Sequence, residues 1–320
     1  MGTDRGYPPQ VKEFARVRME QTPNNLQIAR DIKNKFQLDK ELDIIRRMVS
    51  NWRDAWNVEA KKIPIKRLFF DIEKSHYLVK LFSIGKVRWV DYGKIVKHSE
   101  IICISYKWQY EDKVHTLDWR IGQRAMLKEF VKVMAEAHEL IGHNIVDFDL
   151  KELRTHCIQH GVLMFPTYRT LDTLKKARKF FRFPSNKLDY ISTHLNNEGK
   201  LEHEGEQLWY AVEDGDEDAL KRMISYCERD VAITEDSFFV MSPYIDHNNN
   251  FSVLTGGGKW HCPECTSENV MMFRTYSTPL GIIRREMKCK ECEKKYKISN
   301  KTYMAMLEYE MRGKYIDNSN

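Results

Sequence analysis

Two acidic residues, Asp71 and Glu73, stand two positions apart at the end of the apolar run in RLFFDIEKS (67–75). The run has the composition of a buried strand, in which side chains at i and i+2 point to the same face. Two carboxylates held side by side either share a proton or bind a cation, and a hard divalent ion with oxygen ligands is their natural partner. Taken alone, such a pair is more typical of two solvated acids at a strand end.

Two later stretches carry further polar residues with a defined spacing. In GHNIVDFDLKEL (142–153), Asp147 and Asp149 lie where a strand pattern passes into a helix pattern, and an acid there can also be a simple helix cap. In ISYCERDVAIT (224–234), Tyr226 and Asp230 are four residues apart, which places them on one face of a helix. Each feature is common alone, and it is their order along the chain that indicates one site.

The ordered set FDIE, HNIVDFD and YCERD resembles the three motifs of the DEDD superfamily of 3′–5′ exonucleases. These enzymes have a ribonuclease H-like fold and include the proofreading domains of DNA polymerases, and a tyrosine in the third motif is typical of their DEDDy branch. The segment from 170 to 200 is similar to the helical stretch between the second and third motifs in B-family polymerases. The resemblance covers about residues 66–243 and implies an α/β fold, with a mixed five-stranded sheet flanked by helices.

The resemblance also implies a set of catalytic roles. The acids that match the family's metal ligands are Asp71, Glu73, Asp149 and Asp230, and Tyr226 matches its tyrosine. Two Mg²⁺ ions, or Mn²⁺ in their place, would then be held by the four carboxylates during phosphodiester hydrolysis, with Asp71 bridging them. The Tyr226 hydroxyl would orient the attacking water, because an ordinary pKa near 10 suits a positioning group better than a base.

Three other polar residues of the second motif have different expected roles. Asp147 falls where relatives often carry a polar filler, so Asp149 is the preferred ligand. Asn144 matches a substrate-binding position, although a structural hydrogen bond at the strand end fits equally well. His143 is expected to be structural, because the third motif already carries Tyr226 in place of the histidine used by other DEDD enzymes.

Four of the seven cysteines form two CxxC pairs near the C-terminus: Cys262, Cys265, Cys289 and Cys292. This spacing predicts one structural Zn²⁺ ion with four thiolate ligands, and the segment resembles a zinc ribbon. The ribbon could bind nucleic acid through its Arg and Lys residues, bind a protein partner, or only stabilise the C-terminus. The other cysteines, Cys103, Cys157 and Cys227, are expected to be buried thiols.

The segment 1–60 is expected to be a helical, helix-turn-helix-like module, in which the second helix presents Arg46, Arg47 and Arg53 to nucleic acid. The run Thr22-Pro23-Asn24 is a plausible helix start or break. The alternative is a helical hairpin that only packs on the main domain. The remaining boundaries are expected at 64–245 for the ribonuclease H-like domain, 246–258 for a linker, 259–300 for the zinc ribbon and 301–320 for a tail.

Within 64–245, strand and helix patterns alternate, which fits an antiparallel meander followed by βα units. Strands are expected at 67–72, 101–108, 113–119 and 139–145. Helices are expected at 123–137, 149–161, 173–181, 188–195 and 216–245.

The apolar and charged residues of the chain indicate which classes of protein it can belong to. The chain of 320 residues has no run of about 18 apolar residues, and its N-terminus lacks the apolar stretch of a signal peptide, so a cytoplasmic protein without a membrane span is expected. Residues 1–66 hold 14 Lys or Arg against 9 acids, and residues 256–320 hold 12 against 8. Basic ends flanking an acidic centre suit a polyanion held over a cation-binding site. A phage-encoded protein acting in the host cytoplasm would fit this organisation.

The sequence therefore predicts a metal-dependent 3′–5′ exonuclease that acts on single-stranded 3′ ends, with DNA favoured over RNA. The alternatives are an inactive nucleic-acid-binding or regulatory protein, or a structure-specific endonuclease, on the same fold. Against the inactive protein, no acid of the three motifs is replaced. The Tyr-x-x-x-Asp spacing favours the exonuclease over the endonuclease.

Overall fold

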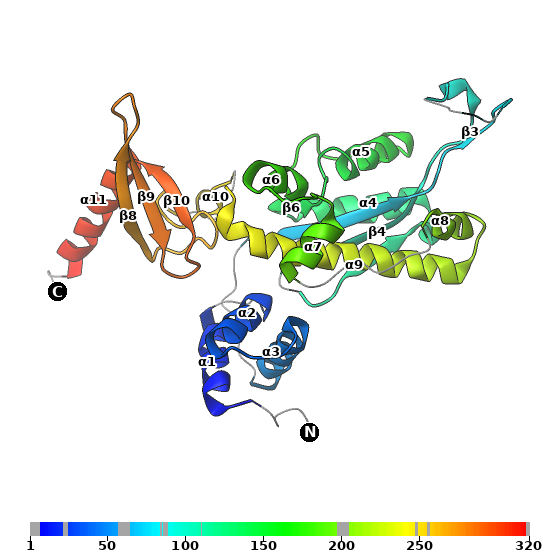
Figure 1. Cartoon of the computed structure of the whole chain (residues 1–320). Coiled ribbons are helices and arrows are strands. Elements are labelled where there is room, and N and C mark those ends of the chain that lie inside the picture. The colour runs from blue at the N-terminus through cyan, green and yellow to red at the C-terminus, as the bar shows by residue number, and fades with distance from the viewer. Residues whose placement is uncertain are drawn as a thin grey trace. The chain divides into compact units, whose positions relative to one another are not determined.

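The computed structural model describes residues 7–21, 25–56, 65–83, 85, 89–109, 111–196, 205–246, 249–254 and 257–317. The chain divides into two compact units. One is Lys66–Met241, and the other combines the flanking segments Met1–Ile65 and Ser242–Asn320 (Figure 1). No helix in the described ranges is both long enough and apolar enough to cross a lipid bilayer.

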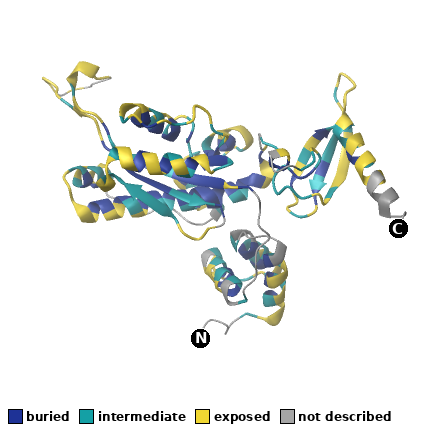
Figure 2. Cartoon of the chain, turned by 180° about the vertical axis from the view of Figure 1, so that it is seen from behind, coloured by how far each residue is buried: buried dark blue, intermediate teal, exposed yellow. Residues whose placement is uncertain are grey.

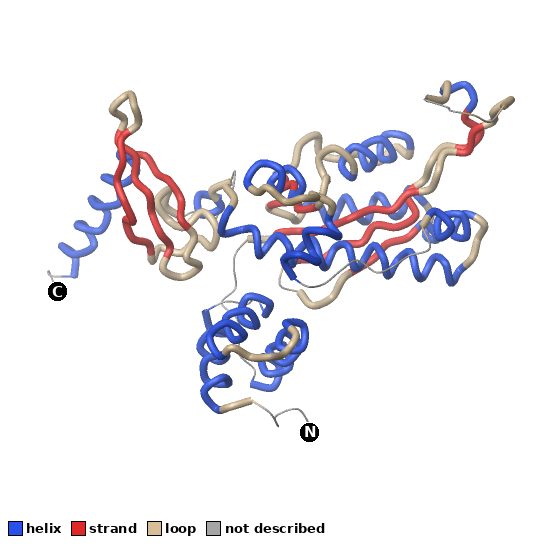
Figure 3. The backbone as a smooth tube through the Cα atoms, viewed as in Figure 1, coloured by secondary structure: helices blue, strands red, loops and turns tan. Residues whose placement is uncertain are grey.

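A mixed sheet forms the centre of the unit Lys66–Met241 (Figure 3). Its five strands, in the described part of the chain, lie in the order β5-β4-β1-β6-β7, with β4 antiparallel to β1 and β5, and β6 parallel to β1 and β7. The strands are β1 (Arg67–Lys74), β4 (Ile101–Trp108), β5 (His115–Asp118), β6 (Glu139–Gly142) and β7 (Thr170–Asp172). This arrangement confirms the predicted five-stranded mixed sheet of the ribonuclease H-like fold.

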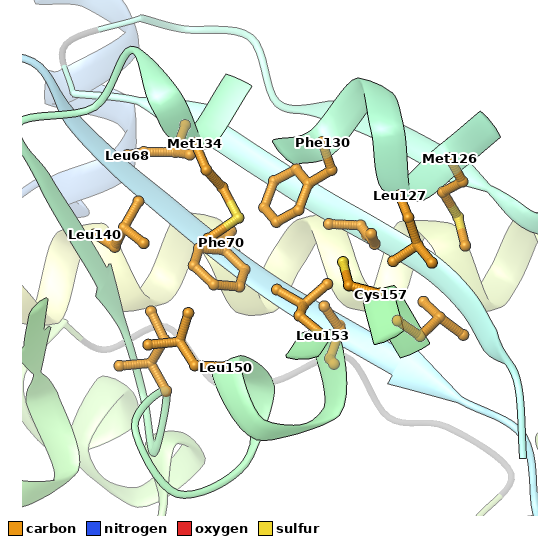
Figure 4. Close-up of a cluster of buried hydrophobic side chains, with 14 of the residues drawn as sticks. Leu68, Phe70, Met126, Leu127, Phe130, Met134, Leu140, Leu150, Leu153 and Cys157 are labelled. Carbon is orange, nitrogen blue, oxygen red and sulfur yellow. The ribbon is translucent and has the colours of Figure 1, made fainter. Parts of the chain in front are cut away.

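Helices cover both faces of this sheet, and the alternation of β1 side chains shows which helix lies on which face. Phe70 lies 5.0 Å, ring centre to ring centre, from Phe130 of α4, in a core to which α5 also contributes (Figure 4). Phe69 faces the other way and lies 5.6 Å from Phe238 of α9. The helices of this unit are α4 (Gln123–Ala135), α5 (Asp149–Gln159), α6 (Thr173–Phe180), α7 (Leu188–Asn196), α8 (Glu206–Glu213) and α9 (Glu217–Met241).

The long amphipathic pattern expected at 216–245 is the single helix α9, which contacts both β1 and β4 along its length. Between β1 and β4 the chain forms a small antiparallel pair that the sequence did not predict. It consists of β2 (Leu78–Val79) and β3 (Ile95–Lys97), with the short helix η1 (Tyr92–Lys94) before β3. A second short helix, η2 (Trp119–Ile121), follows β5.

The N-terminal segment contains, in its described residues, the helices α1 (Pro9–Gln21), α2 (Asn25–Phe36) and α3 (Leu42–Trp56). They bury a shared apolar core that includes Ala15, Ile32 and Val49. Arg53, predicted to face nucleic acid, instead donates hydrogen bonds to Asn25 Oδ1 at 3.0 Å and to the Met19 carbonyl at 3.2 Å. The predicted break at Thr22-Pro23-Asn24 lies outside the described residues, and the helix-turn-helix comparison stays a prediction.

The C-terminal segment contains a three-stranded antiparallel sheet within residues 257–317, in the order β10-β9-β8. Its elements are β8 (Val270–Ser277), β9 (Ile283–Cys289), β10 (Lys295–Ser299) and the helix α11 (Asn300–Asp317). Helix α11 therefore extends through most of the segment that was expected to be a tail, 301–320. One side of α11 packs on the sheet through Met306, while Tyr309 and Met311 are exposed (Figure 2).

The described residues of the expected linker at 246–258 include a short helix, although the sequence there is rich in Asn and Gly. After the short helix η3 (Ser242–Tyr244), the described part contains α10 (Phe251–Leu254), in which Phe251 and Ser252 are buried. The Ser252 hydroxyl donates to the Gly258 carbonyl at 2.6 Å. The boundary of the second unit accordingly falls at Ser242.

Candidate active site

Three carboxylates converge at the end of β1. Asp71 and Glu73 share the face of β1 that carries Phe69, because side chains alternate along a strand. That face packs against α9, which supplies Asp230, and oxygen atoms of the three carboxylates all lie within 4.8 Å of one another. The strand and the helix therefore bring together acids that are more than 150 positions apart in the sequence.

The donor set of this cluster fits a divalent cation. Asp71 and Glu73 are half-buried, and Asp230 is 5% exposed, so water screens their mutual repulsion poorly. Like charges at this separation favour protonation or cation binding. Mg²⁺ and Mn²⁺ prefer carboxylate oxygen ligands more strongly than softer metals do.

Asp149 approaches the same end of β1 from α5, at its first residue. Pairing of β1 with β6 extends only to Phe69 and Ile141, and beyond it the Ile72 N–H donates to Asp149 Oδ1 at 3.2 Å. Asp149 is therefore anchored next to Asp71 but does not lie within 4.8 Å of all three clustered acids. Burial raises the pKa of the Asp149 carboxyl to about 7, so a nearby cation would shift it towards its charged form.

A sharp turn after β6 brings the chain to Asp149. At Gly142, a Cβ atom would lie only 2.9 Å from Ile145 Cβ and 3.0 Å from the Phe70 carbonyl, so a side chain there has no room. Asn144 then adopts a φ of 70°. The buried Asp172 carboxylate accepts the N–H groups of Asn144 at 3.2 Å and Val146 at 3.3 Å, and so holds the loop.

Two residues of the second motif make contacts that define their roles. The His143 ring lies 2.9 Å from Thr173 Oγ1 and 3.0 Å from the Asn186 carbonyl, in line with the structural role expected for it. Asp147 is exposed and forms ion pairs with Lys175 at 2.8 Å and Lys151 at 3.2 Å. These lysines lower the pKa of Asp147, whose carboxylate is thus held by surface lysines while that of Asp149 is held by β1.

Tyr226 lies on α9 one turn before Asp230. It is buried, and its ring meets the ring of Trp209 from α8 edge-on, with 6.2 Å between the ring centres. Its position on the helix that supplies Asp230 agrees with the expected spacing.

Two further residues at the site, Cys227 and Asp172, were not predicted. The Cys227 Sγ atom lies 3.6 Å from Asp71 Oδ2 and 3.5 Å from the Asp71 carbonyl. Burial raises the pKa of the Cys227 thiol, which leaves it protonated and able to donate to Asp71. For Cys227, the only indication in the sequence was its position one helical turn before Asp230. For Asp172, the only indication was a helix-capping position.

The four predicted zinc ligands also converge. Sulfur atoms of Cys262, Cys265, Cys289 and Cys292 all lie within 4.8 Å of one another. The two closest pairs join opposite CxxC turns, at 3.5 Å for Cys262 with Cys292 and 3.6 Å for Cys265 with Cys289. Four sulfur atoms in this arrangement can hold one tetrahedral ion.

A comparison with protein-family models supports the fold. Residues 68–236 match the family model of the RNase_H superfamily. No curated protein gives a match to this chain. Among solved structures, the family B DNA polymerase from the hyperthermophilic archaeon Pyrobaculum calidifontis is similar, at 17% sequence identity and a TM-score of 0.43. The match covers 58% of this chain and 26% of the polymerase chain, so this protein matches about a quarter of that polymerase.

Proposed function

This chain belongs to the RNase H superfamily, and from that premise we propose that it is a metal-dependent nuclease that removes nucleotides from the 3′ ends of DNA. The observation that carries the proposal is the convergence of Asp71, Glu73 and Asp230 within 4.8 Å, at the end of the central strand. A cluster of this kind fits a divalent cation, because bound positive charge would offset the mutual repulsion of the three carboxylates.

Each acid has a distinct part in the proposed reaction. Asp71, Glu73 and Asp230 would hold two Mg²⁺ ions, with Asp149 completing the set from the opposite side of β1. When bound, such ions would stabilise the negative charge that develops on oxygen atoms. They would also lower the pKa of metal-bound water, so that it can act as a nucleophile at neutral pH. The Cys227 thiol donates to the Asp71 carboxylate and so fixes its orientation.

Tyr226 is proposed to position the attacking water by a hydrogen bond from its hydroxyl. It lies one turn before Asp230 on the same face of α9, and the contact with Trp209 restricts its ring. A group fixed in this way can lower the barrier through orientation alone, without transferring a proton.

A basic segment beside the site suits a polyanionic substrate. Residues 173–187 contain six Lys or Arg residues and no acid. Five of these are exposed: Lys175, Arg178, Lys179, Arg182 and Lys187. The His143 contacts with Thr173 and Asn186 tie both ends of this segment to the loop that leads to Asp149. We propose that the segment binds substrate phosphates, with Asn144 as a further substrate contact.

The cysteine cluster is proposed to hold one structural Zn²⁺ ion, which has the ligand preference that four thiolates satisfy. It lies in a different unit from the acidic cluster, so its proposed role is in stability rather than hydrolysis.

The test is cleavage of single-stranded DNA and RNA oligomers by purified protein, with and without Mg²⁺. Wild-type protein is expected to cleave only with the metal ion, and Asp71→Asn is expected to lose at least about 100-fold in rate, the usual loss for one electrostatic group. Asp147→Asn is the matched control, because it removes an exposed carboxylate of the same unit. Cleavage that survives Asp71→Asn, or that occurs without divalent ions, would overturn the proposal.

A further inference from the structure

The β8–β10 sheet has two chemically different faces. On one face, Met287 and Ile298 are buried beneath Met306 of α11. The side chains on the other face are largely exposed, including Phe273 at 49%, and Arg274 and Lys297 each at 65%. We call this second surface the open face.

Strand register defines which residues belong to the open face. Arg274 pairs with Glu286, and Glu286 pairs with Lys297, so these three side chains form one row across the sheet. Directly paired residues of antiparallel strands point to the same side. An irregularity between Met272 and Arg274 brings Phe273 to that side too, as shown by Lys295 Nζ, which lies 4.2 Å from the centre of its ring.

The open face is strongly basic. Its strands carry Arg274, Arg284, Lys288, Lys295 and Lys297 against the acid Glu286, and Lys288 also pairs with Glu293 at 3.1 Å. Glu286 is already neutralised, because Arg274 Nε lies 2.6 Å and Lys297 Nζ 3.7 Å from its carboxylate oxygens. With five basic residues against Glu286 and Glu293, the surface presents a net charge of +3, which is complementary to a polyanion.

Aromatic rings lie among these cations. Phe273 and Tyr276 are on the edge strand β8, and Lys297 Nζ lies 5.4 Å from the centre of the Tyr276 ring, as Lys295 lies near Phe273. Alternating rings and cations are what single-stranded nucleic acid requires, because bases stack on the rings while phosphates pair with the cations. In a duplex the base faces are already stacked, so the rings would gain little.

We propose that the open face of β8–β10 is a binding site for single-stranded nucleic acid, with Phe273 and Tyr276 as stacking platforms and Lys295 and Lys297 as phosphate contacts. This site lies in a different unit from the acidic cluster and does not depend on the proposed hydrolysis. A zinc-stabilised sheet supported by α11 on its back supplies the rigidity that a stacking surface needs.

The test is fluorescence anisotropy of a labelled single-stranded DNA of about 16 nucleotides, the upper range of one small binding module. The protein is the full zinc-loaded chain carrying Asp71→Asn, so that cleavage cannot interfere. Phe273→Leu/Tyr276→Leu keeps apolar bulk but removes both rings, and it is expected to weaken binding about fivefold or more. Lys295→Ala/Lys297→Ala should weaken binding and reduce the slope of log K against log salt by about 1.4, since each phosphate contact contributes about 0.7.

Lys301→Ala is the matched control, because it removes an exposed charge from α11 on the covered side of the sheet. Affinities of the open-face variants that equal that of Lys301→Ala would overturn the proposal. So would a loss of affinity for a duplex of the same length as large as the loss for the single strand. Cleavage by protein with an intact Asp71, measured in parallel, reports separately on the proposed nuclease: either activity can fail while the other stands.

Discussion

At the scale of single residues, the site is defined by which carboxylates share a face and which do not. Asp147 and Asp149 are two positions apart, yet Asp147 pairs with two surface lysines while Asp149 is buried and accepts from the backbone of β1. Sequence spacing favoured Asp149 through the family resemblance, and the contacts supply an independent physical reason for the same choice.

This difference leads to a paired prediction. Asp149→Asn keeps an oxygen to accept the Ile72 N–H but loses the negative charge, so the fold should persist while the rate falls by about 100-fold or more. Asp147→Asn should change the rate by less than about twofold, since exposed substitutions away from a site usually have small effects. Steady-state cleavage rates of the two variants, measured side by side, check the prediction. Equal losses in both would contradict it.

A second prediction concerns the Tyr226 hydroxyl. Tyr226→Phe retains the ring that contacts Trp209 and removes only the proposed water-positioning group. We expect kcat to fall by about 10- to 100-fold with KM little changed, the size of loss that misplacement of a reacting group produces. Single-turnover cleavage under saturating enzyme would isolate the chemical step. A variant that raises KM alone would show that Tyr226 contacts substrate instead.

The residue scale also shows what the sequence could not supply. Asp71, Glu73, Asp230 and Tyr226 were predicted because the order of their motifs along the chain resembles that of a known family, with spacings that fit one strand and one helix. The contact of Cys227 with Asp71 joins residues 156 positions apart and depends on how α9 is rotated against β1. Nothing in the local pattern specifies that rotation, so the thiol beside the clustered acids was interpreted only as a buried cysteine.

At the scale of elements, the longest apolar patterns were predicted best. The strand expected at 101–108 has the bounds of β4. The helix expected at 216–245 is α9, which begins at Glu217 and ends at Met241. Strands β2, β3 and β7 have two or three residues each, too few for an alternating pattern to emerge. Helix α11 was missed because exposed Met304, Tyr309 and Met311 obscure the narrow stripe that packs on the sheet.

The pairing of β1 with β6 contains a buried ion pair that sets its register. Arg67 Nε lies 2.9 Å from Glu139 Oε2, and both side chains are only 1% exposed. Arg67 also donates to Gln109 Oε1 at 3.3 Å. The two charged residues are register partners at the start of their strands, so the pair anchors the strand that ends in Asp71.

Removing one partner should therefore be costly. Arg67→Met leaves the Glu139 carboxylate buried without its cation, and we expect the unfolding free energy of this unit to fall by about 3–5 kcal/mol. The neighbouring Lys66–Glu136 pair is exposed on both sides, so Lys66→Met should cost less than about 1 kcal/mol. Urea unfolding followed by circular dichroism compares the two variants. A matching urea midpoint for both would show that the buried pair does not hold the strands together.

At the scale of the whole molecule, the two candidate metal sites lie in different units. The acidic cluster belongs to Lys66–Met241, and the cysteine cluster belongs to the other unit. The uneven charge of the sequence indicated basic flanks, and the open face of β8–β10 shows how one of them arranges its basic residues.

This division predicts the result of removing the metal from the cysteine cluster. Cys289→Ser should lower zinc content from about one ion per chain to near zero, and should make residues 257–317 sensitive to protease, since so small a sheet depends on its metal. The unit Lys66–Met241 should remain resistant. Cys157→Ala is the control, because Cys157 is a buried thiol in the apolar core of that unit. Zinc measured by mass spectrometry decides the matter, and equal zinc content in Cys289→Ser and wild type would contradict the assignment.

The proposed 3′–5′ exonuclease activity is tested most directly by the product pattern from single-stranded DNA labelled at its 5′ end. With Mg²⁺, we expect a ladder of products that shorten from the 3′ end one nucleotide at a time. This ladder should be absent with Asp71→Asn and present with Asp147→Asn. Internal cuts that appear before shorter ladders form, or release of the labelled 5′ nucleotide first, would contradict a 3′–5′ exonuclease at this site.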